Sequence, residues 1–506
     1  EVASPAKAPT LPPATALPAD EPEPKRVHLA PFGGTLLTTK TPQTISVILP
    51  CAEERETSIR TVERFCERTP FENLAEIIVV DDGSQPPLQS LFARDKRRLD
   101  QNPRCRLKFV RHAMTTGLMA AKLTGGKVAQ GDILAFIDCH CAPQWKWEEP
   151  ILRLVRENPR RMVVPEITDL DMDTFDEKKP SAVYSKCYLT FDGDFKWFDD
   201  DSDYIPTISG GLVAMGREWF NLTGGFDEAM HGWGGENLDQ SLRAWLCGGE
   251  IMRARGSRIA HMWRGGDPRT TARYRVKAAG TNNRGRVAAA WYDKFLDVYR
   301  GRVVDKQEVR NYDGLKQRLQ CRPFSYFVYR FRRIYIEGGV IPKTAFQIRE
   351  KRSNLCLTRH IGTLVADECG EGRRQQIFQF GNVNTKTRKC CKGLRIYSSN
   401  DCIDYIDDNG PHFYPCDVSG NNGNQGYILT EGGHIRKDPP HEVGNECLYV
   451  GTSIGKRVQK MACKELEGDQ GIFERIFEFE TKEWGIWKSE MQKYRYDEDF
   501  PDLLDN

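Results

Sequence analysis

The chain has 506 residues, of which 39% are hydrophobic and 28% charged, and its 73 basic and 71 acidic side chains leave a formal charge of +2. This near balance argues against a nucleic-acid-binding protein, whose binding face is usually strongly basic, and the length predicts about two to four structural units. The sequence has no apolar run near the ~18 residues that a membrane helix needs, so we expect membrane attachment only through an anchor that this chain lacks.

Residues 1–44 are predicted to form a stem or linker rich in Pro and Ala. They hold nine of the 28 prolines and contain no Cys, Trp or Tyr. Such a segment cannot bury enough apolar surface to offset the entropy that ordering would cost. Its composition favours an extended chain instead.

The residues that follow predict an α/β sheet. A helical pattern covers 53–68, and strand-like apolar runs cover 45–50, 75–80, 107–110 and 133–137. Strands separated by helices indicate a mostly parallel sheet, which binds its ligands beyond the carboxyl ends of its strands. Two acidic motifs, Asp81-Asp82 and Asp138-Cys139-His140, stand at such ends, where a nucleotide site is expected.

A divalent metal site is predicted at the second of these motifs. Asp138 and His140 are two residues apart at a strand end, so their side chains are expected to leave the same face. His261 follows another strand-like run and is the expected third ligand. A carboxylate combined with imidazole suits a borderline ion such as Mn²⁺ better than Ca²⁺. Taken alone, an Asp-x-His motif is more often a surface turn, so the metal interpretation depends on agreement with the other motifs.

Two glycine motifs predict a close approach of the backbone to a ligand. Ser209-Gly210-Gly211 precedes an apolar strand, and Trp233-Gly234-Gly235-Glu236-Asn237 opens a predicted helix. Glu236 and Asn237 are expected to point into the site near a helix N-terminus, which favours anions. The alternative is that both motifs only mark turns.

From residue 343 the pattern changes to short strands separated by Gly, Asn and Asp turns. Three weak repeats open at Cys356, Cys402 and Cys447, with a period of about 46 residues. Each contains a second Cys, followed by a Gln and an aromatic residue. The repetition predicts a closed all-β unit, because one repeat cannot bury its own apolar face. Residues 482–506 form an acidic and aromatic tail, whose order the sequence leaves open.

Together the motifs resemble those of the polypeptide N-acetylgalactosaminyltransferases in their order and spacing. The resemblance covers about residues 45–480 and depends on Val79-Val80-Asp81-Asp82, Asp138-Cys139-His140, Ser209-Gly210-Gly211, Trp233-Gly234-Gly235-Glu236-Asn237 and His261-Met262-Trp263-Arg264. It implies an α/β, Rossmann-like GT-A catalytic domain over 45–342. An all-β, ricin-type β-trefoil lectin domain over 343–481 would follow.

The resemblance also implies an activity. Members of this family transfer GalNAc from UDP-GalNAc to Ser/Thr hydroxyls of proteins or glycopeptides, which is mucin-type O-glycosylation, with retention at the anomeric carbon. They use Mn²⁺, and Mg²⁺ is the less favoured ion. The chain is therefore expected in the Golgi lumen as part of a type II membrane protein, with protein or glycopeptide acceptors and with GalNAc glycans bound by its lectin domain.

Each expected site residue takes its role from the matching family motif. The metal ligands are Asp138, His140 and His261. The expected catalytic residues are Glu236 and Asn237, around the sugar, and Trp233, a mobile gate beside the diphosphate. The residues expected to bind the donor are Asp82, Leu49, Cys139, Gly211 and Arg264.

Three places on the nucleotide side depart from the family pattern. Leu49-Pro50-Cys51 replaces Thr-x-His, Thr115 replaces an Arg, and Asp267 and Arg269 stand where the family has His and an aromatic residue. These changes leave an alternative open, a carbohydrate-binding pseudoenzyme with an eroded nucleotide site. The retained metal ligands favour the active enzyme.

The 16 cysteines favour an oxidising compartment with disulfides over buried free thiols. The resemblance implies a Cys247–Cys321 bond, and it implies that the family's pair near the first strand is missing at both ends. The bonds expected in the repeats are Cys356–Cys369, Cys402–Cys416 and Cys447–Cys463. Cys390 and Cys391 receive no predicted partner.

The repeats differ in the residues that a sugar-binding repeat of this family needs. Such a repeat has an Asp two residues after its first Cys, an aromatic residue before the second Cys and an Asn before the Gln. The carboxylate accepts hydrogen bonds from sugar hydroxyls, the ring stacks on the sugar and the amide both donates and accepts. The middle repeat alone has all three, Asp404, Tyr414 and Asn424. One GalNAc site per chain is expected, and the alternative is that Asp404 only caps a turn.

Overall fold

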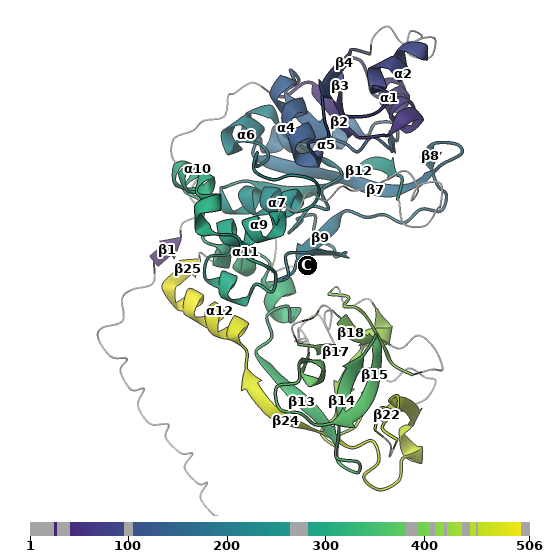
Figure 1. Cartoon of the computed structure of the whole chain (residues 1–506), viewed down its shortest axis with the longest axis vertical. Helices are drawn as coiled ribbons and strands as arrows, with labels where there is room; N and C mark the ends of the chain where they lie inside the picture. Colours follow the sequence, from purple (N-terminus) through teal and green to yellow (C-terminus); the bar gives the residue numbers. More distant parts are fainter. Residues whose placement is uncertain are drawn as a thin grey trace, which may run out of the picture.

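A computed structural model describes residues 25–27, 41–95, 105–263, 282–380, 393–397, 399, 401–404, 410–418, 422–437, 446–451 and 454–496. Figure 1 shows an α/β unit at one end of the molecule, an all-β unit at the other, and helix α12 (Lys482–Lys493) running alongside both. In the described residues, no helix is both long and apolar enough to cross a membrane.

The α/β unit is built on a nine-stranded mixed sheet, of which eight strands follow one path. Along this path the strands are β4 (Leu107–His112), β3 (Leu74–Asp82), β2 (Ile45–Cys51), β5 (Ile133–Phe136), β11 (Val213–Gly216), β7 (Arg161–Asp171), β12 (Glu250–His261) and β6 (Cys141–Pro143). The first four are parallel to one another, as predicted, and β11 and β6 enter antiparallel. β8 (Asp176–Glu177) pairs with β7 off this path.

Helices cover both faces of this sheet, which explains its continuous apolar strands. Helices α1 (Arg55–Arg68), α2 (Leu88–Arg94) and α5 (Glu148–Glu157) pack on the face that Val47 and Leu49 line. Helices α4 (Leu118–Val128), α6 (Arg217–Thr223) and α7 (Glu236–Leu246) pack on the face that Ile48 and Ile78 line. Side chains alternate along a strand, so the side chain of Leu49 lies in the core.

A helical layer completes the α/β unit beside α7. It comprises α9 (Asn283–Trp291), η1 (Asp293–Val298), η2 (Lys306–Val309), α10 (Asn311–Leu319), α11 (Phe324–Arg330) and η3 (Arg333–Glu337). Asp239 and Arg243 of α7 form a buried ion pair of 2.6 Å against this layer, and Trp291 Nε1 of α9 donates to Asp239 at 2.8 Å. A buried charged pair of this kind needs its hydrogen bonds to offset the loss of hydration.

The all-β unit contains a ring of strands, as the repeat pattern predicted. The ring runs through β14 (Leu355–His360), β15 (Thr363–Glu368), β19 (His412–Pro415), β18 (Asp401–Asp404), β17 (Leu394–Ile396), β16 (Phe378–Phe380) and β13 (Thr344–Glu350). Pairing of β13 with β14 closes it. A second sheet holds β20 (Tyr427–Leu429), β21 (Ile435–Lys437), β22 (Glu446–Tyr449) and β23 (Gln459–Ala462).

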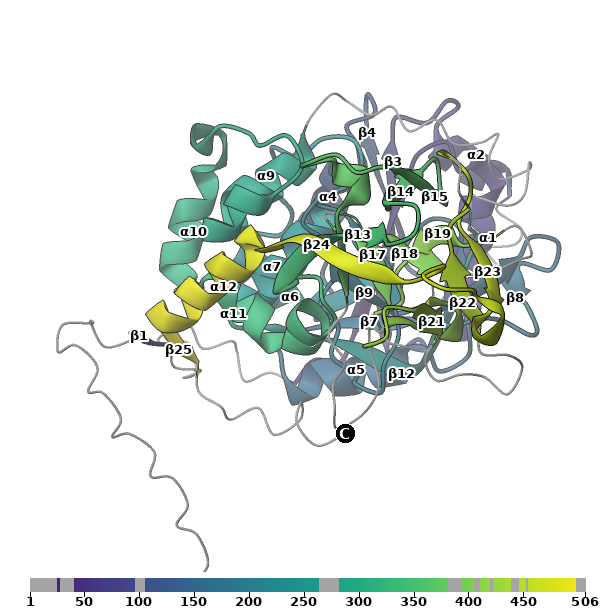
Figure 2. The same ribbon diagram turned by 90° about the horizontal axis from the view of Figure 1, so that it is seen from below.

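The tail returns from the all-β unit to the α/β unit, which the sequence did not predict. Strand β24 (Phe473–Glu480) pairs with β13 and leads into α12, which contacts α11 and lies beside it in Figures 1 and 2. Strand β25 (Tyr494–Tyr496) then pairs in parallel with β1 (Lys25–Val27). The buried Tyr496 hydroxyl lies 2.6 Å from Ser325 Oγ on α11.

All four disulfides expected from the sequence are present, and the described residues contain two more. The confirmed bonds are Cys247–Cys321, Cys356–Cys369, Cys402–Cys416 and Cys447–Cys463. The additional bonds are Cys51–Cys139 and Cys66–Cys105. Cys390 and Cys391 lie outside the described residues.

Candidate active site and metal centre

The structure brings the three expected metal ligands together at the ends of neighbouring strands. Asp138 and His140 lie between β5 and β6, and His261 ends β12, which pairs with β6. Their candidate ligand atoms all lie within 4.8 Å of one another. Asp138 Oδ2 is 3.3 Å from His261 Nε2 and 3.9 Å from His140 Nε2. This donor set of one carboxylate and two imidazoles fits a borderline divalent cation.

The groups around Asp138 hold its carboxylate in the charged form. Burial by itself would raise the pKa of Asp138, but the hydrogen bond to His261 and the charges of His140, His261 and Lys122 hold it well below its usual range. The Asp138 carboxylate is therefore ionised at neutral pH.

The glycine motif before β11 lies directly against the metal cluster. A Cβ on Gly211 would be 2.7 Å from Asp138 Oδ2, and one on Gly210 would be 3.1 Å from Glu236 Oε1. Gly210 also has φ +107°, which L side chains rarely adopt. Glycine at both positions lets this backbone reach the carboxylates, while its close approach to a ligand stays a prediction.

Glu236 and Asn237 lie buried at the start of α7, next to the same glycines. Asn237 Nδ2 donates to Ile208 O at 3.1 Å. Glu236 Oε1 is 3.7 Å from Lys122 Nζ, while Glu236 Oε2 is buried and has no hydrogen-bond partner among the described residues. A buried carboxylate oxygen without a partner is costly and is available for a ligand hydroxyl.

Lys122 is a residue of this site that the sequence reasoning missed. It lies on α4 with a fully buried side chain, and its Nζ donates to Gly210 O at 2.6 Å. The available signal was a Lys between the apolar residues Ala121 and Leu123 of a helical stretch, since buried lysines are rare unless paired.

A second missed residue holds the loop that carries Trp233. Asn283 Nδ2 donates to His231 O at 2.8 Å and to Gly234 O at 2.9 Å. The Trp233 side chain itself is 50% exposed. The loop is thus anchored at its base while its Trp remains accessible, as a gate requires.

The residues expected on the nucleotide side make contacts within the chain. The Asp82 carboxylate accepts from Thr116 N at 2.9 Å and from Gly117 N at 2.8 Å, and it lies 2.7 Å from His112 Nδ1. Asp82 therefore organises this loop with its own neighbours. Leu49 is fully buried in the core, and Cys139 is bonded to Cys51. Arg264 lies outside the described residues, as do Asp267 and Arg269.

An aromatic wall stands beside the metal cluster. Trp263 packs edge-on against His261, and it also contacts Tyr184 and Trp197. Trp197 belongs to the hairpin of β9 (Lys186–Leu189) and β10 (Phe195–Phe198). This hairpin therefore forms part of the site wall.

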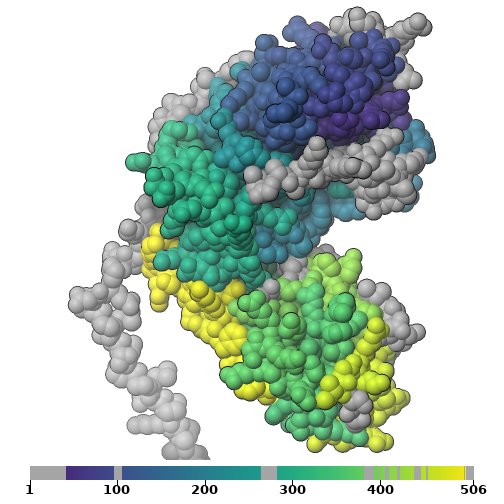
Figure 3. All heavy atoms as spheres, in the orientation of Figure 1, coloured from purple at the N-terminus to yellow at the C-terminus, as the bar shows by residue number. Residues whose placement is uncertain are grey.

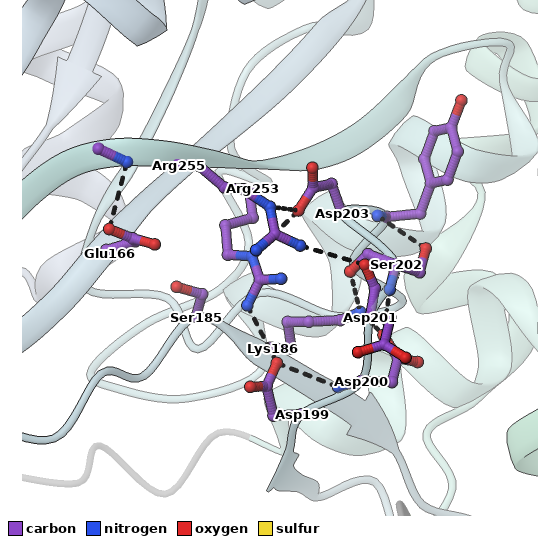
Figure 4. A network of polar contacts seen from close by, with 12 residues as sticks. Glu166, Ser185, Lys186, Asp199, Asp200, Asp201, Ser202, Asp203, Arg253 and Arg255 are labelled. Carbon is purple, nitrogen blue, oxygen red and sulfur yellow. Dashed lines mark hydrogen bonds and ion pairs between the residues drawn. The ribbon is translucent and has the colours of Figure 1, made fainter. Parts of the chain in front are cut away.

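The acidic run after β10 anchors that hairpin. Figure 4 shows Arg253 of β12 reaching Asp199 at 3.0 Å and Asp203 at 3.2 Å, while Lys186 of β9 pairs with Asp200. Several carboxylates of this run are thus taken up by ion pairs within the fold.

A second candidate site lies in the middle repeat of the all-β unit. Asp404 is only 2% exposed; its Oδ2 accepts from Asn422 Nδ2 and Gln425 Nε2, both at 3.0 Å, while its buried Oδ1 has no partner among the described residues. Tyr414 is 54% exposed and shares a face of the β18–β19 hairpin with Asp404. Asn424 is exposed and lies 3.4 Å from Lys437 Nζ, so Asn422 is the asparagine that contacts Asp404.

The matching positions of the other repeats are occupied internally. Thr358 donates to Cys356 O at 3.1 Å and accepts from Gln376 Nε2 at 3.0 Å. Tyr449 pairs with Gln459 through a side-chain hydrogen bond of 2.5 Å. The asymmetry expected among the repeats therefore extends to their contacts.

Comparisons with known proteins converge on one group of glycosyltransferases. A model described as Glycosyl transferase family 2 matches residues 46–220, and one described as N-terminal domain of galactosyltransferase matches residues 200–264. The probable N-acetylgalactosaminyltransferase 9 of Caenorhabditis elegans is 34% identical over 308 residues, which are 57% of this chain and 52% of that protein. Polypeptide N-acetylgalactosaminyltransferase 13 of Rattus norvegicus is 30% identical over 342 residues, 62% of this chain and 59% of that protein.

Among solved structures, a similar one is described as GalNAc-T7 with UDP, GalNAc and Mn²⁺. It aligns with a TM-score of 0.52 at 20% identity and covers 86% of this chain and 82% of that chain. At this identity the likeness concerns the fold. The chain spans about half the length of the first curated relatives that it matches.

Proposed function

We propose that the chain is a polypeptide N-acetylgalactosaminyltransferase, in line with its similarity to such proteins, and that it transfers GalNAc from UDP-GalNAc to Ser or Thr hydroxyls of proteins or glycopeptides, with retention at the anomeric carbon. The observation that carries this proposal is the convergence of Asp138, His140 and His261 beside Gly211 and Glu236. Metal ligands and sugar-binding groups are both needed for transfer, and here they adjoin.

The metal cluster supports a requirement for Mn²⁺. Its donor set fits this ion, and the ionised Asp138 supplies the negative charge that a cation needs. When bound, the metal would supply Lewis-acid stabilisation of the diphosphate leaving group. Asp138, His140 and His261 would hold it.

Glu236, Lys122 and Gly211 would orient the donor sugar. The unpartnered Glu236 Oε2 can accept a hydrogen bond from a sugar hydroxyl, and Lys122 keeps the other oxygen of this carboxylate and the Gly210 carbonyl in place. Trp233 and the aromatic wall would exclude water from the reacting carbon. A leaving diphosphate oxygen can accept the proton of the acceptor hydroxyl on the same face, so the mechanism needs no protein base.

The second site would bind a GalNAc already attached to the acceptor. Asp404 Oδ1 is a buried acceptor without a partner, and Tyr414 offers an exposed ring on the same face. This arrangement supports a ricin-type β-trefoil lectin repeat. Figure 3 shows a broad notch between the two units on the side away from α12, where an acceptor chain could pass between them.

The alternative function is a carbohydrate-binding pseudoenzyme. One observation favours it: Asp82, Leu49 and Cys139 are committed to contacts within the chain, so they offer little to a nucleotide. The intact metal cluster favours the enzyme, because a pure lectin has no use for it.

The disulfides bear on the cellular compartment in which the protein functions. Six disulfides among the described residues indicate an oxidising environment. The Golgi lumen, reached as part of a type II membrane protein, is the location that we propose.

The decisive experiment measures UDP release from UDP-GalNAc with Ser/Thr peptides that are naked or carry one GalNAc. Activity should disappear with a chelator and return with Mn²⁺, and the product linkage should be α. Asp404→Ala should slow transfer to glycosylated peptides by about 10-fold or more, because a bound glycan raises the effective concentration of the acceptor. Naked peptides and the matched Thr358→Ala variant should be unaffected. Absent UDP release would favour the pseudoenzyme, and release that persists without metal would contradict the proposed Mn²⁺ requirement.

A further inference from the structure

A short segment between β2 and α1 contacts the Asp138–His140 motif of the metal cluster. It begins at Cys51, the last residue of β2, and ends at Glu54, which immediately precedes α1. Cys51 is bonded to Cys139, the residue between two of the metal ligands. Glu54 Oε1 lies 3.2 Å from His140 Nδ1. One segment therefore touches the Asp138–His140 motif twice, once covalently and once through a carboxylate.

The contact with Glu54 determines how His140 can act as a ligand. A neutral imidazole carries one proton, and the nitrogen without it binds the metal. With Nδ1–H donating to Glu54, the lone pair is on Nε2, the nitrogen that faces Asp138 at 3.9 Å. A carboxylate that accepts a hydrogen bond from a ligating His fixes the tautomer and the orientation of its ring.

Glu54 is itself held in place. Its Oε2 accepts from Thr57 Oγ1 at 3.3 Å, and the residue is 9% exposed. It also stands at the N-terminus of α1, where the helix dipole favours a negative charge. The carboxylate is thus buried, oriented at both oxygens and adjacent to His140.

We propose that Glu54 is the positioning residue of His140, and that the Cys51–Cys139 bond fixes the backbone from which both act. This inference rests on the proposed metal site and assigns it a support that none of the sequence motifs contains. Glu54 contacts the ligand His140 and is not itself one of the three candidate metal ligands. Its effect passes through the affinity of the site for its metal.

The test is a titration of the full chain with Mn²⁺ in the presence of UDP, followed by the electron paramagnetic resonance signal of free Mn²⁺. Loss of an outer carboxylate typically weakens metal binding by about 10- to 100-fold. We expect a loss in this range for Glu54→Ala and a smaller one for Glu54→Gln, whose amide oxygen can still accept the hydrogen bond. Glu56→Gln, an exposed carboxylate in the first turn of α1, is the matched control and should bind Mn²⁺ as wild type does.

The kinetic readout separates positioning from a general structural role. In both Glu54 variants the concentration of Mn²⁺ for half-maximal rate should rise, while kcat at saturating Mn²⁺ should stay near that of wild type. Equal Mn²⁺ affinity in Glu54→Ala and wild type would overturn the proposal, as would a wild-type chain that binds no Mn²⁺. A wild type that binds Mn²⁺ but transfers no GalNAc would refute the proposed activity and leave the binding comparison valid.

Discussion

The substitution Lys122→Met tests the donor-sugar side of the site independently of its metal side. The ammonium of Lys122 donates to Gly210 O at 2.6 Å and lies 3.7 Å from Glu236 Oε1. A hydrogen bond to a charged group contributes about 1.5–3 kcal/mol, which corresponds to roughly 10- to 150-fold in kcat/KM for UDP-GalNAc at 1.4 kcal/mol per tenfold. Met keeps the length of the side chain, so the cavity that the substitution leaves is small.

The same substitution should not lower the affinity of the site for Mn²⁺, although it lowers kcat/KM. The charge of Lys122 is one of those that lower the pKa of Asp138, so its removal takes a positive charge away from the cation site. Mn²⁺ affinity should stay unchanged or increase while turnover falls. The melting temperature should change little, because the Gly210 carbonyl loses a donor while the cost of burying an ammonium disappears.

The assay pairs UDP-release kinetics with Mn²⁺ titration of the same preparations. Lys127→Met is the matched control, since Lys127 lies on the same helix and forms only an exposed ion pair with Glu228. Its kinetics should equal those of wild type. A Lys122→Met protein with unchanged kcat/KM, or one that loses Mn²⁺ affinity along with activity, would refute this account of the site.

Three further predictions test other parts of the structure. His261→Ala should abolish both Mn²⁺ binding and transfer while the circular dichroism spectrum is retained, because it removes one of three ligands; residual wild-type turnover would contradict the metal assignment. Replacing Cys51 and Cys139 together by Ser should lower the free energy of unfolding by up to about 4 kcal/mol, since the bond closes a long loop. Peptide mapping without reduction should find this pair linked in the wild type, and free thiols there would exclude the bond. Tyr496→Phe should lower the melting temperature by roughly 2–4 °C, because it removes a buried hydrogen bond to Ser325; an unchanged melting temperature would show that this hydrogen bond contributes nothing to stability.

The sequence predicted the elements that are regular and local. Apolar runs such as 45–50 and 75–80 became buried parallel strands, because both faces of a covered sheet must be apolar. The residues at the ends of these strands then met at one edge, which is a consequence of parallel order. That is why Asp138, His140 and His261 could be assigned as a cluster before their distances were known.

Residues that act through contacts distant in the sequence could not be found in this way. Glu54 and His140 are separated by 86 positions, and Lys122 and Gly210 by 88. No local pattern distinguishes Glu54 from an exposed helix-capping carboxylate. Likewise, the family resemblance placed Asp82 on the nucleotide side, and its hydrogen bonds from Thr116 and Gly117 could not be read from the sequence.

The segment between η3 and β13 links the α/β unit to the all-β unit, and side chains of the all-β unit donate hydrogen bonds to it. Arg395 donates to Gly338 O at 2.7 Å, and Gln379 donates to Gly339 O at 2.6 Å, both between η3 and β13. A second set of contacts involves α12, where Glu483 lies 2.7 Å from the Tyr397 hydroxyl of the all-β unit and 3.4 Å from Arg300 of the α/β unit. Each contact fixes the all-β unit against the α/β unit at a different point, so rotation about the linker would have to break buried hydrogen bonds. Under the proposed function, a glycan bound at Asp404 would therefore present to the metal site only those hydroxyls that lie at a matching distance along the acceptor, and these contacts would set that distance.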